Sequence, residues 1–524
     1  MIHFCKNREF YYFSQFSDDD AGFSTFAAMQ KKFISNLWLL LFLNLLIKPF
    51  WILGVDRSVQ NLVGFGEYGF YTTILNFSFL FNILLDFGIT NYNNRNIAQY
   101  QHLLSKHFSN ILVLRFILAA IYFVVIMLTG IILGYDKRQM NLLAIVGFNQ
   151  FLLALILYLR SNISGLLMFR TDSILSVLDR FLMIIFVGYL LLNQHFKLHF
   201  RIEWFVYTQT LAYIITCIIA LIIVWKKAGK IKLHWNFPFL VMIIKQSIPF
   251  AILTLLMSTY NRIDPVILER LIPDPQGNYQ VGIYAAAYRL LDAFNMVAYL
   301  FSVFLLPTFA ALIKQKGNIL PFIKFSFSTL FVFSILIAFT ALYYSSELMT
   351  LMYPQHSDES SIEFQTRLNQ SSLVFTLLMF AFISISSSYV FGTLLTANGN
   401  LKHLNIIAAM CVVINLSINL LLIPHIMATG SAIASLSAQT FSTMAQIVVV
   451  IKIFKIKTDK RYLSALLIFT IIALLSGFII KQLGISWIQG ICIIWIIGLI
   501  SAISLKLINV NLLVKTLTEK SDNI

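Results

Sequence analysis

Four charged residues stand in or beside two apolar segments between positions 248 and 307: Arg262, Asp264, Arg289 and Asp292. A charge at the centre of a membrane-spanning helix costs roughly 3 kcal/mol, so such a residue usually faces a partner, a water-filled cavity or a ligand. Arg289 and Asp292 are three residues apart and would share one face of a helix. Their position therefore predicts either a structural ion pair or a binding site that faces a cavity.

Cations dominate the residues that could bind a ligand. Lys48 stands in the outer half of the first apolar run, where it could snorkel to the membrane surface or face a cavity. Arg262 lies near the external end of its segment and could be an interfacial residue instead. A cavity lined by several cations and few acids would suit an anion. We therefore predict Lys48, Arg262 and Arg289 as the substrate-binding residues of such a cavity.

Three acids are candidates for ion coupling or for structural pairing: Asp86, Asp264 and Asp292. Asp86 is the deepest acid of the second apolar run, where it could hold a cation or a proton, or pair with a neighbouring helix. The four cysteines and nine histidines lack the spacing of metal ligands. We therefore expect neither a metal site nor a cofactor.

The elements that carry these residues are expected to be membrane-spanning helices. Hydrophobic residues make up 59% of the 524 positions, only 11% are charged, and the mean hydropathy is +0.82. Apolar runs of about 20 residues recur along the chain, which matches a bilayer core crossed by α-helices. The sequence thus predicts an all-α polytopic membrane protein with about fourteen spans. They fall near 34–54, 69–92, 110–133, 141–168, 175–193, 204–225, 243–263, 281–311, 320–344, 371–395, 403–423, 428–452, 463–481 and 486–507.

The net charge of +16 reflects orientation in a membrane rather than nucleic-acid binding. Basic clusters fall between alternate spans, for example at 226–232 and 452–461, which is the positive-inside pattern. This pattern predicts that both termini are cytoplasmic. The same clusters would meet anionic lipid, so membrane lipid is an expected partner and nucleic acid is not.

The predicted spans divide the chain into four parts. Residues 1–30 would be a cytoplasmic N-terminal extension, and the layout around Met29 is compatible with an alternative start at that residue. Residues 31–232 would form an N-terminal lobe of six helices and 233–457 a C-terminal lobe of six. Residues 458–524 would add two further transmembrane helices and a cytoplasmic tail.

A weak internal repeat links the two predicted lobes. The motif at 66–71, Gly-Glu-Tyr-Gly-Phe-Tyr, enters the second span much as Gly-Ile-Tyr-Ala-Ala-Ala-Tyr at 282–288 enters the eighth. A repeat of six spans makes the lobes parallel repeats about an axis along the membrane normal. A cavity between two such lobes is the natural substrate site, and the charges at 262–292 would lie on its seventh and eighth spans.

No enzyme chemistry is predicted. The extramembrane loops are short, the longest being roughly 345–370, and none carries paired carboxylates or a nucleophile with a histidine. No phosphate-binding glycine-rich loop is present either. These features disfavour a membrane glycosyltransferase or a polysaccharide polymerase, and we expect no catalytic residues.

Several motifs resemble those of polysaccharide biosynthesis proteins of the oligosaccharide flippase type. They are Lys-Pro-Phe-Trp-Ile at 48–52 with Asp-Arg at 56–57, the motif at 66–71, Arg-Ile-Asp at 262–264 with 281–289, and Thr-Gly-Ser-Ala-Ile-Ala at 429–434. The likeness extends over about 31–506. It implies the fold of the multidrug/oligosaccharidyl-lipid/polysaccharide exporter superfamily, with two six-helix lobes plus two helices.

The resemblance also implies an activity, which we state as an expectation. It implies transfer of a polyprenyl-diphosphate-linked oligosaccharide, such as an O-antigen or capsule repeat unit of lipopolysaccharide or polysaccharide biosynthesis, across the inner membrane by alternating access. Polysaccharide polymerases and glycosyltransferases would be its partners. By position, Lys48, Arg262 and Arg289 match the cavity cations that such flippases present to a diphosphate. The alternative is a cation-coupled multidrug exporter of the same superfamily.

Overall fold

The computed structural model describes residues 42–90, 93, 97, 103–228, 237–314, 317–356, 359–457 and 459–508. The predicted N-terminal extension, the start at Met29 and the cytoplasmic tail lie outside these residues. Every element in the described ranges is helical, and no strand is found in them. The prediction of an all-α fold is confirmed.

The first described residues, 42–50, are helical and continue into the elements of the N-terminal half. These elements are η1 (Trp51–Asp56), α2 (Arg57–Leu80), α3 (Ile83–Asp86), α5 (Leu103–Ile132), α6 (Lys137–Gly165), α7 (Phe169–Leu192), α8 (Gln194–Leu198) and α9 (Ile202–Ala228). The remaining elements are α10 (Phe237–Arg262), α11 (Asp264–Leu271), α12 (Gln276–Lys314), α13 (Leu320–Met352), α14 (Ser361–Ala397), α15 (Leu401–Ile426), α16 (Ala428–Phe454), α17 (Lys460–Gln482) and α18 (Trp487–Ser504).

Ten of the helices between Phe108 and Ser504 are long and apolar enough to cross a membrane. A spanning segment must satisfy its own backbone hydrogen bonds in lipid, and long helices do so. The chain is therefore a multi-pass membrane protein. These ten helices of the described ranges do not confirm the predicted total of about fourteen spans, because 34–54, 69–92, 243–263 and 281–311 are not among them.

The helix ends follow local sequence signals. Asp136 and Gln139 form a capping box at the start of α6, and Ser360 and Glu363 form one at the start of α14. Gly64 interrupts α2 with a φ of 85°, a conformation that glycine adopts readily. The predicted loop at 345–370 is largely helical, because α13 runs to Met352 and α14 begins at Ser361.

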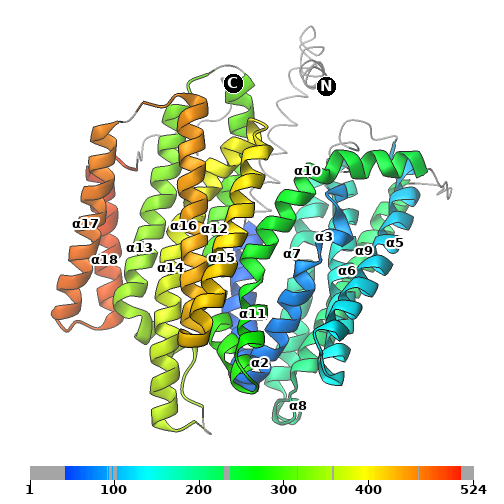
Figure 1. The fold of residues 1–524 in the computed structure, drawn as a ribbon, viewed down its shortest axis with the longest axis horizontal. Helices are drawn as coiled ribbons and strands as arrows, with labels where there is room; N and C mark the ends of the chain where they lie inside the picture. Colours follow the sequence, from blue (N-terminus) through cyan, green and yellow to red (C-terminus); the bar gives the residue numbers. More distant parts are fainter. Residues whose placement is uncertain are drawn as a thin grey trace.

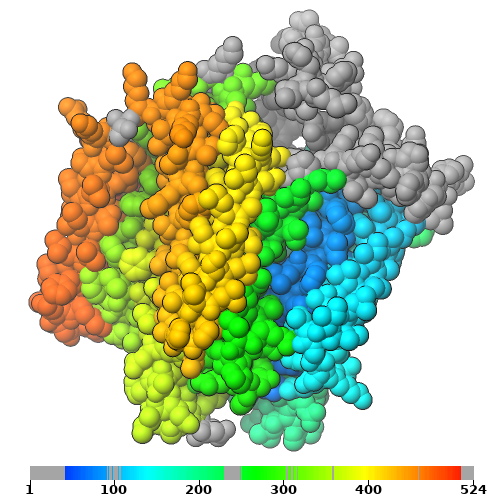
Figure 2. Space-filling model, in the orientation of Figure 1, coloured from blue at the N-terminus to red at the C-terminus, as the bar shows by residue number. Residues whose placement is uncertain are grey.

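Two large apolar cores lie side by side. One is built mainly from residues of η1 to α9, and the other mainly from residues of α11 to α16. Figure 1 shows the corresponding helices as two groups, with α17 and α18 beside α13 at the far edge of the second group. On the face shown in Figure 2, α10 (green) lies between α15 (yellow) and the blue and cyan helices of the first group. The exact lobe boundaries stay a prediction.

The two groups touch where the repeated glycine motifs meet. A Cβ atom on Gly69 of α2 would lie 1.7 Å from the backbone oxygen of Asn278, and one on Gly282 of α12 would lie 2.0 Å from that of Phe65. Small residues allow two helix backbones to approach this closely in a membrane. The motifs that the sequence relates as repeats thus pack directly against each other.

Candidate functional site

A cavity of about 1010 Å³ lies between the two groups of helices. Its walls come from the helix at 42–56 and from α2, α6, α7, α9, α10, α12, α14, α15 and α16. Pockets for drug-sized ligands usually measure about 300 to 1000 Å³, so this cavity has room for a larger head group. Three cations and two acids line it: Lys48, Arg180, Arg262, Asp56 and Asp292.

Lys48 and Arg180 stand on the wall formed by the N-terminal helices. Lys48 forms no ion pair with any carboxylate in the part of the chain that the structure describes. Arg180 on α7 lies 3.7 Å from its neighbour Asp179 and over the rings of Trp51 and Tyr213, with centroid distances of 5.8 and 5.9 Å. Nearby rings stabilise a cation without neutralising its charge. This wall therefore keeps positive charge available to a ligand.

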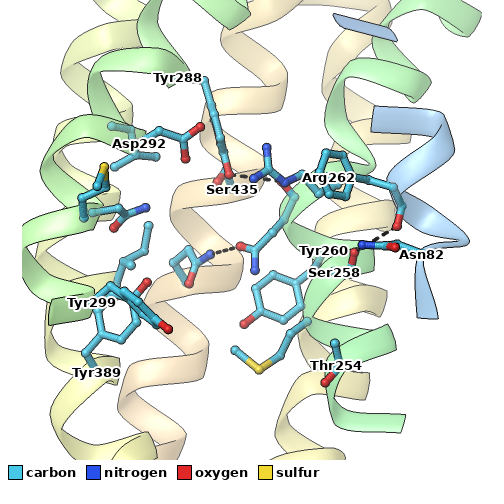
Figure 3. A pocket seen from close by; sticks show the side chains of 18 of the residues that line it. Asn82, Thr254, Ser258, Tyr260, Arg262, Tyr288, Asp292, Tyr299, Tyr389 and Ser435 are labelled. Carbon is cyan, nitrogen blue, oxygen red and sulfur yellow. Dashed lines mark hydrogen bonds between the residues drawn. The ribbon is translucent and has the colours of Figure 1, made fainter. Parts of the chain in front are cut away.

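Arg262 ends α10 on the opposite side of the cavity. Its guanidinium lies over the rings of Phe79 and Tyr288, at 5.3 and 5.7 Å from their centroids. Figure 3 shows Arg262 beside Tyr288, with Asp292 of α12 on the far side of that ring. Among the described residues no carboxylate forms an ion pair with Arg262. The aromatic contacts hold the guanidinium in place and leave its charge free.

Arg289 has a different environment from Lys48 and Arg262. It forms an ion pair with Asp56 at 2.9 Å, donates to Gln60 at 2.9 Å and to the Tyr353 hydroxyl at 3.4 Å, and is 6% exposed. It lines a smaller adjoining cavity of about 130 Å³. The sequence raised a pair between Arg289 and Asp292, but the structure pairs Arg289 with an acid of the other helix group. Arg289 thus links the two groups.

Backbone contacts extend this link toward the external side predicted from the sequence. Gln60 donates to the Gly282 carbonyl at 2.9 Å, while Arg57 and Asn61 donate to the Met352 carbonyl at 2.6 and 2.9 Å. We call the contacts of Asp56, Gln60 and Arg289, together with the crossing of Gly69 and Gly282, the floor of the cavity. The floor joins the two helix groups below the ligand space.

A second layer supports the floor. Arg367 of α14 lies over the Phe65 ring at 4.4 Å and forms an ion pair with Glu359 at 2.7 Å. Phe65 in turn packs against Tyr353, with ring centroids 5.7 Å apart. Burial raises the pKa of Glu359, but the hydrogen bonds from Arg367 outweigh this effect, so the pKa lies below its usual value. The ionised pair therefore holds the loop between α13 and α14 against α2.

The acids predicted for coupling are not all on the cavity. Asp264 is 1% exposed and accepts hydrogen bonds from Tyr284, Asn415 and Asn419 at 2.7 to 2.9 Å. No lysine, arginine or histidine in the described ranges pairs with it. Asp292, by contrast, lines both cavities.

Asp86 lies apart from this site. It forms an ion pair with Arg115 of α5 and accepts a hydrogen bond from the Thr90 backbone at 3.1 Å. Arg115 is 2% exposed and also donates to the Leu85 carbonyl at 2.6 Å. The structure therefore gives Asp86 a structural partner of opposite charge.

Sequence reasoning did not single out Arg180 or predict the role of Asp56. Arg180 stands three residues beyond Val177 in an apolar run, and a charge within such a run was the signal that identified Arg289. Asp56 was noted only as part of a motif, because nothing in the sequence shows that it faces α12. No group of three possible metal ligands is found in the described ranges.

Comparison of the sequence with known proteins gives one family match. Residues 57–313 match the family model described as "Polysaccharide biosynthesis protein". No curated protein sequence matches the chain.

Solved structures share the fold at low identity. "Lipid II flippase MurJ, inward closed conformation" is 15% identical, with a TM-score of 0.61, and the match covers 91% of this chain and 99% of that one. A multidrug resistance MATE family transporter of the MOP superfamily, in an inward-facing conformation, is 14% identical with a TM-score of 0.55, covering 79% and 96%. The MATE transporter VcmN from Vibrio cholerae, in its bent form, is 16% identical with a TM-score of 0.51, covering 82% and 97%.

These similarities show a shared fold, and the family match supplies the sequence relationship. Of the motifs on which the resemblance was based, those at 66–71, 262–264 and 281–289 lie within the matched residues, whereas those at 48–52 and 429–434 lie outside them. The family predicted from sequence is therefore confirmed over residues 57–313: this part of the chain belongs to the polysaccharide biosynthesis protein family.

Proposed function

We propose that the protein is a flippase that moves a polyprenyl-diphosphate-linked oligosaccharide across the inner membrane by alternating access. The observation that carries the proposal is a large cavity between two helix groups, with Lys48 and Arg262 on it and without carboxylate partners among the described residues. The saccharide would be a repeat unit of O-antigen, capsule or a similar polysaccharide. No covalent bond need be made or broken.

The physical chemistry of the substrate supports this assignment. A diphosphate carries negative charge and binds water strongly, so its unaided passage through hydrocarbon is very unfavourable. Arginine donates several hydrogen bonds in a planar fork that fits phosphate oxygens. The polyprenyl tail can stay in lipid while the head group occupies the cavity.

The three predicted substrate residues take two roles in this proposal. Lys48 and Arg262 bind the diphosphate in the state with a closed floor, because no carboxylate in the described ranges forms an ion pair with either of them. Arg289 is held by Asp56 in that state. It reaches the substrate only when the two lobes separate and the ion pair opens. Arg289 therefore links the opening of the floor to the passage of the head group.

Ion coupling is assigned to Asp264 among the three acids considered. Asp86 already has Arg115 as a partner, whereas Asp264 is buried and, within the described part of the chain, accepts hydrogen bonds from neutral groups alone. A buried carboxylate without a counter-charge is costly, so binding a proton or a monovalent cation would stabilise it. We expect Asp264→Asn to remove the dependence of transport on an ion gradient while substrate binding remains.

A cation-coupled multidrug exporter is the second candidate function. The MATE transporters of similar fold and the presence of Asp292 on the cavity favour it. The proposed location of the protein, with both termini in the cytoplasm, and the division into lobes at 31–232 and 233–457 apply to either function. Polymerase and glycosyltransferase partners are proposed for the flippase alone.

Cells that lack the protein provide the test. The flippase proposal predicts that lipid-linked oligosaccharide accumulates on the cytoplasmic leaflet and that surface polysaccharide disappears. The wild-type gene should restore both, whereas a Lys48→Met/Arg262→Met double variant present at the same level should not. Unchanged lipid-linked oligosaccharide together with increased drug sensitivity would contradict the flippase and favour the exporter.

A further inference from the structure

The helices α14, α15 and α16 form one wall of the cavity, and none of the described residues that line this wall is charged. These are Ile385, Ser388, Tyr389, Gly392, Thr393, Thr396, Leu404, Ile407, Ala408, Ser435, Gln439, Ser442 and Gln446. Hydroxyl and amide groups make up most of the polar surface, and α12 adds Asn295, Tyr299 and Ser302 beside them. We call these residues of α12, α14, α15 and α16 the neutral wall. Its chemistry differs from that of the wall with Lys48 and Arg180.

The neutral wall holds hydrogen-bond acceptors that have no partner. Gln446 is 7% exposed, and its side-chain nitrogen donates to the Ser442 hydroxyl at 3.1 Å, but its Oε1 atom has no hydrogen bond. The Oδ1 atom of Asn295 is likewise buried and unpartnered. An unsatisfied buried oxygen costs about 1 to 3 kcal/mol, so a donor on the ligand would be strongly favoured here.

These acceptors discriminate between the parts of a ligand. A diphosphate offers only acceptor oxygens at neutral pH, so it cannot bond to Oε1 of Gln446 or Oδ1 of Asn295. A hydroxyl group or a secondary amide offers a donor. The neutral wall therefore suits a ligand portion that is uncharged and rich in donors.

Two tyrosine rings stand beside the unpartnered acceptors. The rings of Tyr299 and Tyr389 have centroids 6.2 Å apart in an edge-to-face arrangement, and Tyr299 is 55% exposed although it lines the cavity. Figure 3 shows both rings on the side of the cavity away from Arg262. Gly392, one turn beyond Tyr389, packs directly against the Gln446 amide, since a Cβ atom there would lie 3.1 Å from Oε1.

We propose that the neutral wall is the saccharide subsite, which holds a sugar ring against Tyr299 and Tyr389 and receives its hydroxyl or amide donors at Gln446 and Asn295. A pyranose presents one face of C–H groups, which packs on an aromatic ring, and a rim of donors. The diphosphate then lies toward Lys48 and Arg262. This inference rests on the proposed flippase function and adds the orientation of the head group to it.

The test compares two lipids on purified protein in detergent by isothermal titration. The first is undecaprenyl diphosphate without sugar, and the second is the lipid-linked oligosaccharide extracted from cells that lack the protein. The subsite predicts that the wild type binds the glycosylated lipid about tenfold more tightly than undecaprenyl diphosphate. Tyr299→Leu and Gln446→Met should each weaken binding of the glycosylated lipid by about fivefold. The affinity for undecaprenyl diphosphate should stay within about twofold of the wild-type value.

Two further variants separate the possible failures. Tyr207→Leu changes a half-exposed tyrosine that does not line the cavity and should leave both lipids unaffected. Lys48→Met should weaken the binding of both lipids to the same extent. The saccharide subsite would be overturned if Tyr299→Leu or Gln446→Met weakened the binding of both lipids equally. It would also be overturned if neither variant changed the binding of the glycosylated lipid. Either result would leave the proposed flippase function intact. A wild-type protein that binds neither lipid would overturn the proposed function and this inference with it.

Discussion

The floor and the walls of the cavity both contain buried charge, but they treat it in opposite ways. At the floor, Arg289 is neutralised by Asp56 and bonded to Gln60. On the walls, Lys48 and Arg262 have no carboxylate partner among the described residues. The comparison teaches that depth in an apolar helix does not by itself identify a binding residue. The partners decide whether the charge serves structure or a ligand.

The largest effect should follow from breaking the ion pair of the floor. Arg289→Met leaves Asp56, whose side chain is only 15% exposed, with the Tyr68 hydroxyl as its remaining partner. Loss of one member of a buried pair costs about 3 to 5 kcal/mol. We expect a decrease of that size in the free energy of unfolding, measured by denaturant titration in detergent.

A double variant serves as the control for this pair. Asp56→Asn/Arg289→Met removes both charges, so most of the lost stability should return. If Arg289→Met alone unfolds like the wild type, the floor does not depend on this pair and the contrast with the walls fails.

Glycine substitutions test the floor without changing charge. Gly69→Ala or Gly282→Ala places a Cβ atom within 2.0 Å of a backbone oxygen, so α2 and α12 must separate. Overpacking of this kind costs about 1 to 3 kcal/mol. A single cysteine introduced at Gln60 should then react faster with a membrane-impermeant reagent added outside. Gly66→Ala is the matched control, because nothing lies within 4 Å of its Cβ position.

The unpaired cations of the walls should behave in the reverse manner. Lys48→Met and Arg262→Met remove charges that have no carboxylate partner in the described structure, so the free energy of unfolding should change little. Each should weaken undecaprenyl diphosphate binding by about 10- to 100-fold, the size expected for a charge-assisted hydrogen bond. Lys48→Arg keeps the charge and should retain most of the affinity. A loss of stability without a loss of affinity would show that these residues have a structural role, like those of the floor, and do not bind the ligand.

The smallest effect concerns the outer support of the floor. The pKa of Glu359 is lowered in the folded protein, so its pair with Arg367 stabilises the fold above the unfolded pKa of about 4.3 and is lost as the pH falls through the folded value. Glu359→Gln should lower the free energy of unfolding at pH 7 by about 1 kcal/mol, less than at the Arg289 pair, because the glutamine amide still accepts a hydrogen bond from Arg367. That difference should vanish at pH 3, and a difference that persists there would exclude the ion pair as its cause.

Much of the fold was predictable because membrane helices depend on local apolar composition. The spans predicted from 110–133 onward all coincide with helices, although α10 and α12, which carry the spans at 243–263 and 281–311, are not among the ten candidate membrane spans of the described ranges. The family, too, followed from short motifs such as 66–71. Lys48 and Arg262 could be proposed as cavity residues because a charge in an apolar run is visible in the sequence.

The partners of these charges were not predictable. Helical spacing makes residues three or four apart visible as neighbours, which is why Asp292 was considered for Arg289. The actual partner, Asp56, is on another helix group, and Asp264 meets Asn415 and Asn419, which come 151 and 155 residues later. Such contacts arise from packing of distant helices, so one sequence cannot reveal them.

Transport by the reconstituted protein tests the central claim most directly. Proteoliposomes would carry the lipid-linked oligosaccharide, and an impermeant sugar-cleaving or sugar-binding probe would report the fraction in each leaflet. We predict that the wild type moves the lipid between leaflets and that the Lys48→Met/Arg262→Met double variant, folded and inserted to the same extent, does not. Equal transport by the two proteins would contradict the claim that the unpaired cations of the cavity bind the diphosphate.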